Sequence, residues 1–319
     1  MSLGEFDLIA KYFTRPVRRA ALGIGDDCAL LAPAPGMQLA VSSDMLVEGR
    51  HFLSTVAPDR LGHKALAVNL SDLAACGAQP LAFTLALALP RADERFLEGF
   101  ARGLFALADA HAIELAGGDT TQGPLAICIT VMGELPAGGA LLRSGARPGD
   151  DLWISGAPGD ARLALEVFRG TASLDARAFE AVRAAMERPQ PRIALGLALR
   201  GVATSAIDVS DGLLGDLAHI LRRSGVGAVV EVDAVPRSAV LAAQPPALQR
   251  ECTLAGGDDY ELLFTTPAAR AEQVRAAGRA AQTAVTRIGR IEAGPGLRLV
   301  DRDGRAVADS FGSFDHFRS

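Results

Sequence analysis

Residues 59–77 read DRLGHKALAVNLSDLAACG, and the rest of the chain can be interpreted around them. Apolar residues recur at helical spacing and fill most of the circumference, which is typical of a buried helix. Gly77 and then Pro80 predict where this helix ends. Asn69 and Asp72 are three residues apart, so they share one side of the helix. A carboxylate on a buried helix is costly unless it is paired or binds a cation.

Two interpretations of Asp72 follow from this placement. In the structural one, Asp72 pairs with Lys64 or Arg60, or caps a break in the helix at Ser71. In the functional one, other carboxylates and metal ions gather around Asp72, and the remaining sequence must then supply those carboxylates.

The length and composition set limits on the class of protein. A chain of 319 residues that is 49% hydrophobic is large enough for about two domains. The Gly- and Pro-rich stretch 136–150 is the predicted junction, giving domains 1–137 and 138–319. A net charge of −5 without a long basic run argues against nucleic-acid binding. No apolar stretch reaches the roughly 18 residues of a membrane span, and the N-terminus has no signal-peptide pattern.

The cysteines and histidines argue against a disulfide framework and a zinc site. The four cysteines form no CxxC pair, and the five histidines are scattered without ligand spacing. Reduced, buried thiols in a cytoplasmic protein are the expected state.

Strand-like and helix-like segments alternate in both halves, which predicts an α/β or α+β fold. Strands are expected at 21–31 (interrupted by Gly-Asp-Asp), 38–47, 81–89, 113–116, 125–133, 151–155, 206–209, 226–232 and 261–265. Helices are expected at 4–13 (with Phe6 on the inner side), 59–77, 93–111, 161–169, 191–199, 213–224 and 269–281, with Ser210 to Gly212 capping the helix at 213.

Many acids directly follow a short apolar strand. They are Asp26, Asp27, Asp44, Asp119, Asp208, Asp211, Asp258 and Asp259. If their strands lie in one sheet, these side chains face a shared opening at the sheet edge, where the ligands of open α/β sheets bind. The alternative for each is turn chemistry, because Asp beside Gly is a common turn pair.

Oxygen ligands without His or Cys suit hard cations such as magnesium, whose sites are often completed by substrate phosphates. The Gly-Gly-Asp segments would present backbone N–H groups to phosphate oxygens, and Arg143 or Arg147 could clamp a phosphate. Neither a P-loop sequence nor the protein-kinase motif set is present, so any nucleotide chemistry uses another scaffold.

Seven motifs then occur in a familiar order. They are GIGDDCALL, SSDMLVEGRHF, KALAVNLSDLAACGAQP, GGDTT, RSGARPGD, IDVSDGL and GGDDYELLF. In this order and at these separations the chain resembles the thiamine-monophosphate kinase family, within the superfamily of aminoimidazole ribonucleotide synthetase. The resemblance extends from about Gly4 to Phe317.

The resemblance implies a two-domain PurM-like fold: an N-terminal ATP- and metal-binding domain, whose sheet pairs in a homodimer, and a C-terminal α/β domain. It implies transfer of the ATP γ-phosphoryl group to thiamine monophosphate with several Mg²⁺ ions, with Asp27, Asp72 and Asp208 as catalytic residues. By motif position the magnesium ligands would be Asp27, Ser42, Ser43, Asp44, Asp72, Asp119, Asp208 and Asp211. ATP would contact Gly118, Asp119, Arg143 and Ser210, and thiamine monophosphate would contact His51, Asp258 and Phe314.

Such a reaction needs few side chains that act as general bases. A phosphate monoester has its second pKa near 6, so the acceptor is largely ionised at neutral pH and needs no general base. The expected mechanism is therefore direct transfer without a phosphoenzyme. The alternatives are another ATP-dependent enzyme of the same superfamily that activates an amide or carbonyl oxygen, and a non-catalytic nucleotide-binding protein.

Overall fold

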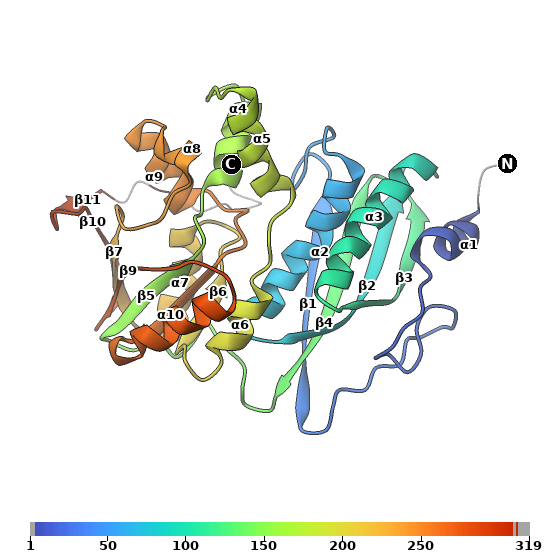
Figure 1. Cartoon of the computed structure of the whole chain (residues 1–319), viewed down its shortest axis with the longest axis horizontal. Coiled ribbons are helices and arrows are strands. Elements are labelled where there is room, and N and C mark those ends of the chain that lie inside the picture. The colour runs from blue at the N-terminus through green and yellow to red at the C-terminus, as the bar shows by residue number, and fades with distance from the viewer. Residues whose placement is uncertain (1–3, 309–310, 312–319) are drawn as a thin grey trace. The chain divides into compact units, whose positions relative to one another are not determined.

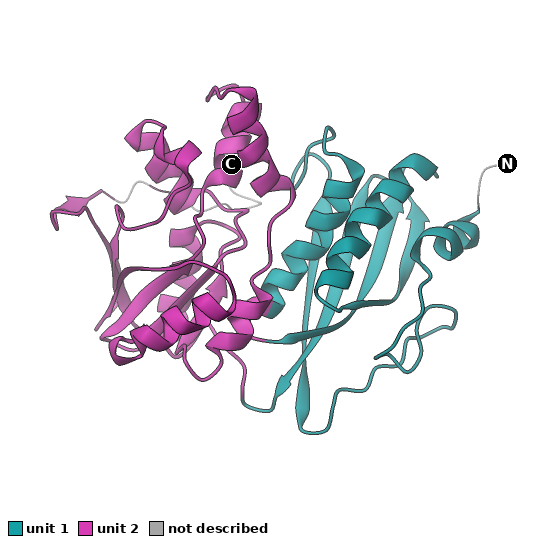
Figure 2. Cartoon of the chain, in the orientation of Figure 1, with its two compact units in different colours: residues 1–73, 78–138 teal, residues 74–77, 139–319 magenta. Residues whose placement is uncertain are grey.

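The computed structural model describes residues 4–308 and residue 311. The chain divides into two compact units, which are coloured separately in Figure 2. Unit 1 comprises residues 1–73 and 78–138, and unit 2 comprises residues 74–77 and 139–319. Each unit is described by itself below. Among the described residues, no helix combines the length and the apolarity needed to cross a membrane.

Unit 1 is a four-stranded sheet with helices on one face (Figure 1). Its elements are α1 (Glu5–Leu8), the π-helical turn η1 (Ile9–Phe13), β1 (Met37–Val47), α2 (Pro58–Ala75), β2 (Gln79–Leu89), α3 (Glu94–Ala110), β3 (Glu114–Gln122) and β4 (Ala126–Pro136). The strand order is β1-β4-β2-β3; β4 runs antiparallel to β1 and β2, and β2 runs parallel to β3.

Side-chain alternation gives this sheet one buried and one open face. Phe83 and Leu85 of β2 and Val131 of β4 are buried on the face covered by α2 and α3. On the opposite face, Val41 and Met45 of β1 are exposed. The predicted buried helix is confirmed as α2, and its apolar residues are buried around most of the circumference.

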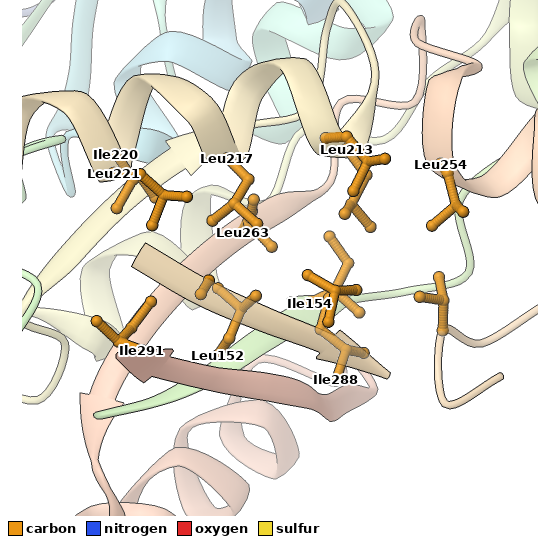
Figure 3. Close-up of a cluster of buried hydrophobic side chains, with 14 of the residues drawn as sticks. Leu152, Ile154, Leu213, Leu217, Ile220, Leu221, Leu254, Leu263, Ile288 and Ile291 are labelled. Carbon is orange, nitrogen blue, oxygen red and sulfur yellow. The ribbon is translucent and has the colours of Figure 1, made fainter. Parts of the chain in front are cut away.

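Unit 2 is built on a seven-stranded sheet of order β11-β10-β7-β9-β5-β8-β6. Its elements are β5 (Asp150–Ser155), α4 (Asp160–Phe168), α5 (Ala176–Glu187), α6 (Ile193–Leu199), β6 (Ser205–Asp208), α7 (Leu213–Ser224), β7 (Gly227–Glu231), α8 (Ala239–Ala242), α9 (Pro246–Ala255), β8 (Leu262–Pro267), η2 (Ala268–Arg270), α10 (Ala271–Ala280), β9 (Val285–Glu292), β10 (Gly296–Val300) and β11 (Ala306–Val307). Figure 3 shows its main core, in which Leu213 and Leu217 of α7 pack on Leu152, Leu263 and Ile288 of the sheet.

The prediction of a strand at 21–31 is wrong. This segment has only isolated bridges, Leu22 with Leu30 and Ile24 with Asp26, and joins neither sheet. Gly25 has φ +127°, so the backbone turns back on itself before a ladder can form. Phe6, expected on the inner side of the first helix, is 81% exposed.

The strand predicted at 113–116 is longer in the structure. Strand β3 continues through Gly117, Gly118 and Asp119 to Gln122. Its parallel pairing with β2 shifts register between Phe83, which pairs with Leu115, and Thr84, which pairs with Gly117. The next residue, Gly118, takes φ +149°. The Gly-Gly-Asp segment is therefore part of a strand, and turn chemistry, the alternative for Asp119, does not apply to it.

Candidate active site

A cavity of about 790 Å³ lies in unit 1 between the start of the chain and strand β3. Asp26 and Asp27 line it from the irregular 21–31 segment, and Gly118 and Asp119 line it from β3. The backbone at Gly118 lies so close to β2 that a Cβ there would be 1.9 Å from the Leu85 carbonyl oxygen. The cavity thus combines carboxylates with a glycine-rich backbone, as expected for a phosphate–cation site.

A second group of predicted residues lies between β1 and α2. Ser42 Oγ donates to Asp72 Oδ2 at 2.5 Å, and the Asp44 backbone N–H donates to Asn69 Oδ1 at 3.0 Å. The Asn69 amide in turn donates to the Ala65 carbonyl oxygen at 3.0 Å. The side of α2 that carries Asn69 and Asp72 therefore faces β1, and the two residues join the helix to the Ser42–Asp44 segment.

Ser43 does not share the face of Ser42. Its hydroxyl lies 2.9 Å from Thr130 Oγ1 and 3.2 Å from the Ile129 carbonyl oxygen on β4. Because side chains alternate along a strand, Ser43 projects from the face of β1 opposite to Ser42. His51 lies in the following loop, where its Nδ1 accepts the Val47 backbone N–H at 3.0 Å.

In unit 2, the IDVSDG and GGDDY segments are joined by backbone hydrogen bonds. The N–H groups of Asp258 and Tyr260 donate to the carbonyl oxygens of Ser210 (2.7 Å) and Val209 (2.8 Å). These bonds continue the antiparallel pairing of β6 with β8, in which Asp208 lies opposite Leu262. The structure therefore brings Asp208, Ser210 and Asp258 to one end of this strand pair. Asp258 and Tyr260 have φ near +60°, an unusual conformation that marks a constrained loop.

The prediction that Ser210 to Gly212 provides a side-chain cap for α7 is wrong. Gly212 is the N-cap, with φ +115° and no side-chain hydrogen bond. Instead, Asp216 from the first turn of α7 turns back, and its Oδ2 accepts the N–H groups of Ser210 (3.0 Å) and Asp211 (3.1 Å). Burial raises the pKa of Asp216 to about 7, although the positive charge of Arg143 acts in the opposite direction. Arg143 is therefore within electrostatic range of this loop.

The far side of the Asp258 loop is fixed by a partly buried ion pair. Arg192 donates to both carboxylate oxygens of Glu261, from Nε at 2.7 Å and also from Nη2, and Ser155 Oγ donates to the same carboxylate. Asp259 Oδ1 accepts the Gly159 N–H at 2.7 Å, and burial raises the pKa of Asp259 well above its usual range. These contacts attach the loop to β5 and to the start of α6.

The predicted acids belong to two sheets, so the condition under which they were expected to face one shared opening, a single sheet, is not met. Asp44 and Asp119 lie within strands of the four-stranded sheet, and Asp208 ends a strand of the seven-stranded sheet. Within the described residues, no three His, Cys, Asp or Glu side chains are grouped as around a bound metal ion. The donors that are present are carboxylate and hydroxyl oxygens, which fit magnesium better than a softer metal. Phe314 lies outside the described residues.

Three residues that organise these groups were not predicted as site residues. Asn69 was noted only for its side of the helix, and Asp216 and Glu261 were not considered. The useful sequence signal was an acid or amide within an apolar run, as in Leu213 to Leu221 for Asp216.

The chain is similar to known proteins over nearly its whole length. Residues 25–135 match the N-terminal domain, and residues 147–302 the C-terminal domain, of AIR synthase related proteins. The thiamine-monophosphate kinase of Salmonella typhimurium is 46% identical over 99% of both chains, and that of Escherichia coli K12 is 44% identical over 99% of both. The crystal structure of the Stenotrophomonas maltophilia K279a thiamine-monophosphate kinase superposes with a TM-score of 0.85 at 46% identity, over 91% of this chain and 92% of that one.

The two domains and their glycine-rich, acid-lined segments define an AIR synthase related protein with a PurM-like α/β fold, as predicted. Within that class the chain belongs to the thiamine-monophosphate kinase family and is a phosphotransferase. The fold alone does not distinguish this family, because the hydrogenase maturation protein HypE of E. coli superposes with a TM-score of 0.79 at 20% identity.

Proposed function

We propose that this chain phosphorylates thiamine monophosphate to thiamine diphosphate, by direct in-line transfer of the ATP γ-phosphoryl group assisted by several Mg²⁺ ions. The observation that carries the proposal is the unit 1 cavity, in which Asp27, Gly118 and Asp119 combine carboxylates with a glycine-rich strand. A relative, AaThiL, has been solved in complex with AMPPCP and TMP, and superposes at 31% identity with a TM-score of 0.78. AMPPCP is an analogue of ATP. The complex therefore supports ATP and thiamine monophosphate as the pair of substrates of this chain.

The chain's own residues would perform three tasks. Asp27, Ser42, Asp44, Asp72, Asp119, Asp208 and Asp211 would hold magnesium, with Ser43 contributing from its backbone because its hydroxyl lies on the other face. Gly118, Arg143 and Ser210 would bind and orient the nucleotide phosphates. His51, Asp258 and Phe314 would bind thiamine monophosphate. Bound magnesium would screen the repulsion between the two phosphate groups and align the attacking and leaving oxygens.

We propose that no side chain acts as a general base or as a phosphorylated intermediate. The acceptor phosphate is largely ionised at neutral pH, so its oxygen can attack without losing a proton to the protein. A chain that retains label from γ-labelled ATP in the absence of acceptor, after gel filtration, would contradict direct transfer.

The decisive test of the substrate compares two acceptors in one ATP-consumption assay. Thiamine monophosphate should support turnover with formation of thiamine diphosphate, and formylglycinamidine ribonucleotide should not. Turnover only with the latter would favour the amide-activating alternative. Nucleotide binding without turnover on either substrate would favour a non-catalytic protein.

We also propose that the protein is a cytoplasmic homodimer. None of the four cysteines, all of which lie within the described residues, forms a disulfide, as expected in a reducing compartment. The expectation that these thiols are buried holds for Cys252 but is wrong for Cys28, which is exposed. The open face of the unit 1 sheet carries exposed Leu39, Val41 and Met45, and β1 is an 11-residue strand at the sheet edge. An apolar face beside a long free edge is the kind of surface that a second copy covers.

A further inference from the structure

We propose that Asp216 is a positioning residue for the phosphotransfer reaction, which holds the Ser210–Asp211 loop in the conformation that binds nucleotide and cation. The inference rests on the proposed function in one respect, the assignment of Ser210 and Asp211 as nucleotide and magnesium contacts. It assigns a role to a residue that does not itself touch the substrate.

The contacts of Asp216 are specific to this loop. One oxygen, Oδ2, accepts two successive backbone N–H groups, from Ser210 at 3.0 Å and from Asp211 at 3.1 Å. Two successive N–H groups can point at one acceptor only in a narrow range of backbone conformations. Asp216 is only 3% exposed, so water cannot replace its carboxylate as the partner of these groups.

The helix that carries Asp216 is fixed to the sheet. Leu213, Leu217 and Ile220 of α7 point into the core formed with β5, β8 and β9 (Figure 3). The Asp216 N–H donates to the Gly212 carbonyl oxygen at 2.9 Å, so the first turn of α7 is intact. Asp216 therefore holds the loop from an immobile support.

The opposite edge of the loop is also bound. The Val209 and Ser210 carbonyl oxygens accept the N–H groups of Tyr260 and Asp258. A Cβ on Gly257 would lie 2.6 Å from the Ser210 carbonyl oxygen, so the two segments are in direct backbone contact. With N–H groups bound on one side and carbonyl groups on the other, the backbone of residues 209–211 has little freedom. The side chains of Ser210 and Asp211 remain available for ligands.

The loop conformation therefore requires a hydrogen-bond acceptor at position 216. In Asp216→Ala the two N–H groups lose their partner and the loop samples other conformations. In Asp216→Asn the amide oxygen can accept the same two bonds, so the loop should keep its conformation. We expect the affinity for magnesium–AMPPCP to fall by about tenfold or more in the alanine variant, and to stay within about threefold of the parent in the asparagine variant.

The test measures three quantities on the full-length protein: binding of magnesium–AMPPCP by calorimetry, the separate kcat and KM values for ATP, and hydrogen exchange of the peptide containing residues 209–212. The alanine variant should show weaker binding, a raised KM with a smaller change in kcat, and faster exchange, and the asparagine variant should restore all three. Leu217→Ala is the matched control, because it weakens the same helix without touching the loop. It should lower the melting temperature and leave nucleotide affinity unchanged.

Two outcomes would overturn the inference. One is faster exchange at residues 209–212 in Asp216→Ala with unchanged AMPPCP affinity and KM, and the other is an equal loss of affinity in Leu217→Ala. If Asp216→Ala does not fold, Asp216→Ser serves instead, because a serine hydroxyl is too short to reach both N–H groups. Failure of the proposed function is separable, because it would appear as a parent protein that binds AMPPCP but does not phosphorylate thiamine monophosphate.

Discussion

Asp72 is a carboxylate on a helix that is otherwise largely apolar, and Ser42 Oγ donates to it at 2.5 Å. If Asp72 holds magnesium, Asp72→Asn should keep the Ser42 hydrogen bond through the amide oxygen but lose the charge that binds the cation. We expect kcat to fall by about 100-fold or more, with little change in melting temperature. Asp59→Asn, on the first turn of the same helix, is the matched control and should retain near-normal turnover. Near-normal turnover in Asp72→Asn would refute the assignment.

Gly118 is required by the backbone of β3. Its φ is +149°, and an added Cβ would lie 1.9 Å from the Leu85 carbonyl oxygen. Gly118→Ala should therefore destabilise unit 1 by roughly 2 kcal/mol or more. At the neighbouring Gly117 a Cβ would meet only Thr84 Cγ2 at 3.9 Å, so Gly117→Ala should be tolerated. Urea unfolding of both variants tests this, and equal stability of the two would contradict the strand conformation described here.

Cys252 should be the least reactive thiol. It is fully buried, and burial raises its pKa to about 12, whereas Cys28 is exposed. At pH 8 a thiol reagent should label Cys28 rapidly and Cys252 only after unfolding. Because the folded state keeps the Cys252 proton above pH 9 and the unfolded state loses it, this residue lowers stability as pH rises from 9 towards 12. Rapid labelling of Cys252 in the native protein would contradict its burial.

For single residues, the sequence predicted which side chains matter better than it predicted which atoms they contact. Asn69 and Asp72 could be placed on one side of a helix, because helical periodicity depends only on spacing. The contact from Asp216 to two backbone N–H groups could not be predicted, because it depends on the conformation of the Ser210–Gly212 loop. The opposite faces of Ser42 and Ser43 follow from strand alternation, but two adjacent hydroxyls in a motif suggested a common role.

Among the elements, one carboxylate accepts three consecutive N–H groups from the segment before β1. Glu114, at the start of β3, accepts the N–H groups of Arg18 (2.7 Å), Arg19 (3.0 Å) and Ala20 (3.3 Å). These donors bind both oxygens of Glu114, and a glutamine has only one acceptor oxygen, so Glu114→Gln cannot keep all three bonds. It should loosen this segment, which leads to Asp26 and Asp27, and should speed tryptic cleavage after Arg18 and Arg19. Glu98→Gln, on the exposed side of α3, is the control. Unchanged cleavage in Glu114→Gln would show that these bonds do not restrain the segment.

The same contact has a defined pH dependence. Burial favours the neutral form of Glu114, but the three N–H donors and Arg19 outweigh it, so its pKa is lowered. A lowered pKa means that the stabilisation is fully present above the pKa of the unfolded state and is lost as pH falls through the folded value. Acidification should therefore release the segment in the parent protein, and Glu114→Gln should not respond in this way. Hydrogen exchange of residues 18–20 measures the release.

Element types were predicted well where one periodicity dominates, as in α2, α3 and β4. Helices α5, α8 and α9 were not predicted. Among the elements that were predicted, the failures lie where glycine and aspartate alternate with apolar residues. Gly117-Gly118-Asp119 resembles a turn in sequence, yet pairing with β2 keeps it in a strand. At 21–31 the same composition is not part of either sheet, because no neighbouring strand pairs with it. Tertiary pairing decides between these outcomes, and a single sequence does not contain that information.

At the scale of the whole molecule, the acid-bearing motifs predicted from the sequence are divided between two sheets. Unit 1 contains the cavity that Asp27 and Asp119 line, and separately the Ser42–Asp72 pair. Unit 2 contains the Ser210 and Asp258 loops, which are hydrogen-bonded to each other. The predicted junction at 136–150 already separates these motifs into two groups. The neighbours of each strand within its sheet could not be predicted, because strand order does not follow chain order in either sheet.

The proposed homodimer gives the last prediction. On the open face of unit 1, Val41 is 62% and Met45 is 56% exposed, and Ser43 lies between them on β1. A carboxylate introduced at such a position would be buried without a partner in the dimer, at a cost of several kcal/mol. Val41→Asp and Met45→Asp should therefore shift the protein from dimer to monomer, with a dissociation constant raised about 100-fold or more.

The measurement is molar mass by light scattering across a micromolar dilution series. Leu142→Asp is the control, because Leu142 of unit 2 is also 56% exposed and apolar but does not belong to the sheet face. It should leave the dimer intact. A parent protein that is monomeric throughout the series, or a Val41→Asp variant that remains dimeric, would show that the open face is not the subunit interface. The exposed apolar residues of β1 would then require a different partner.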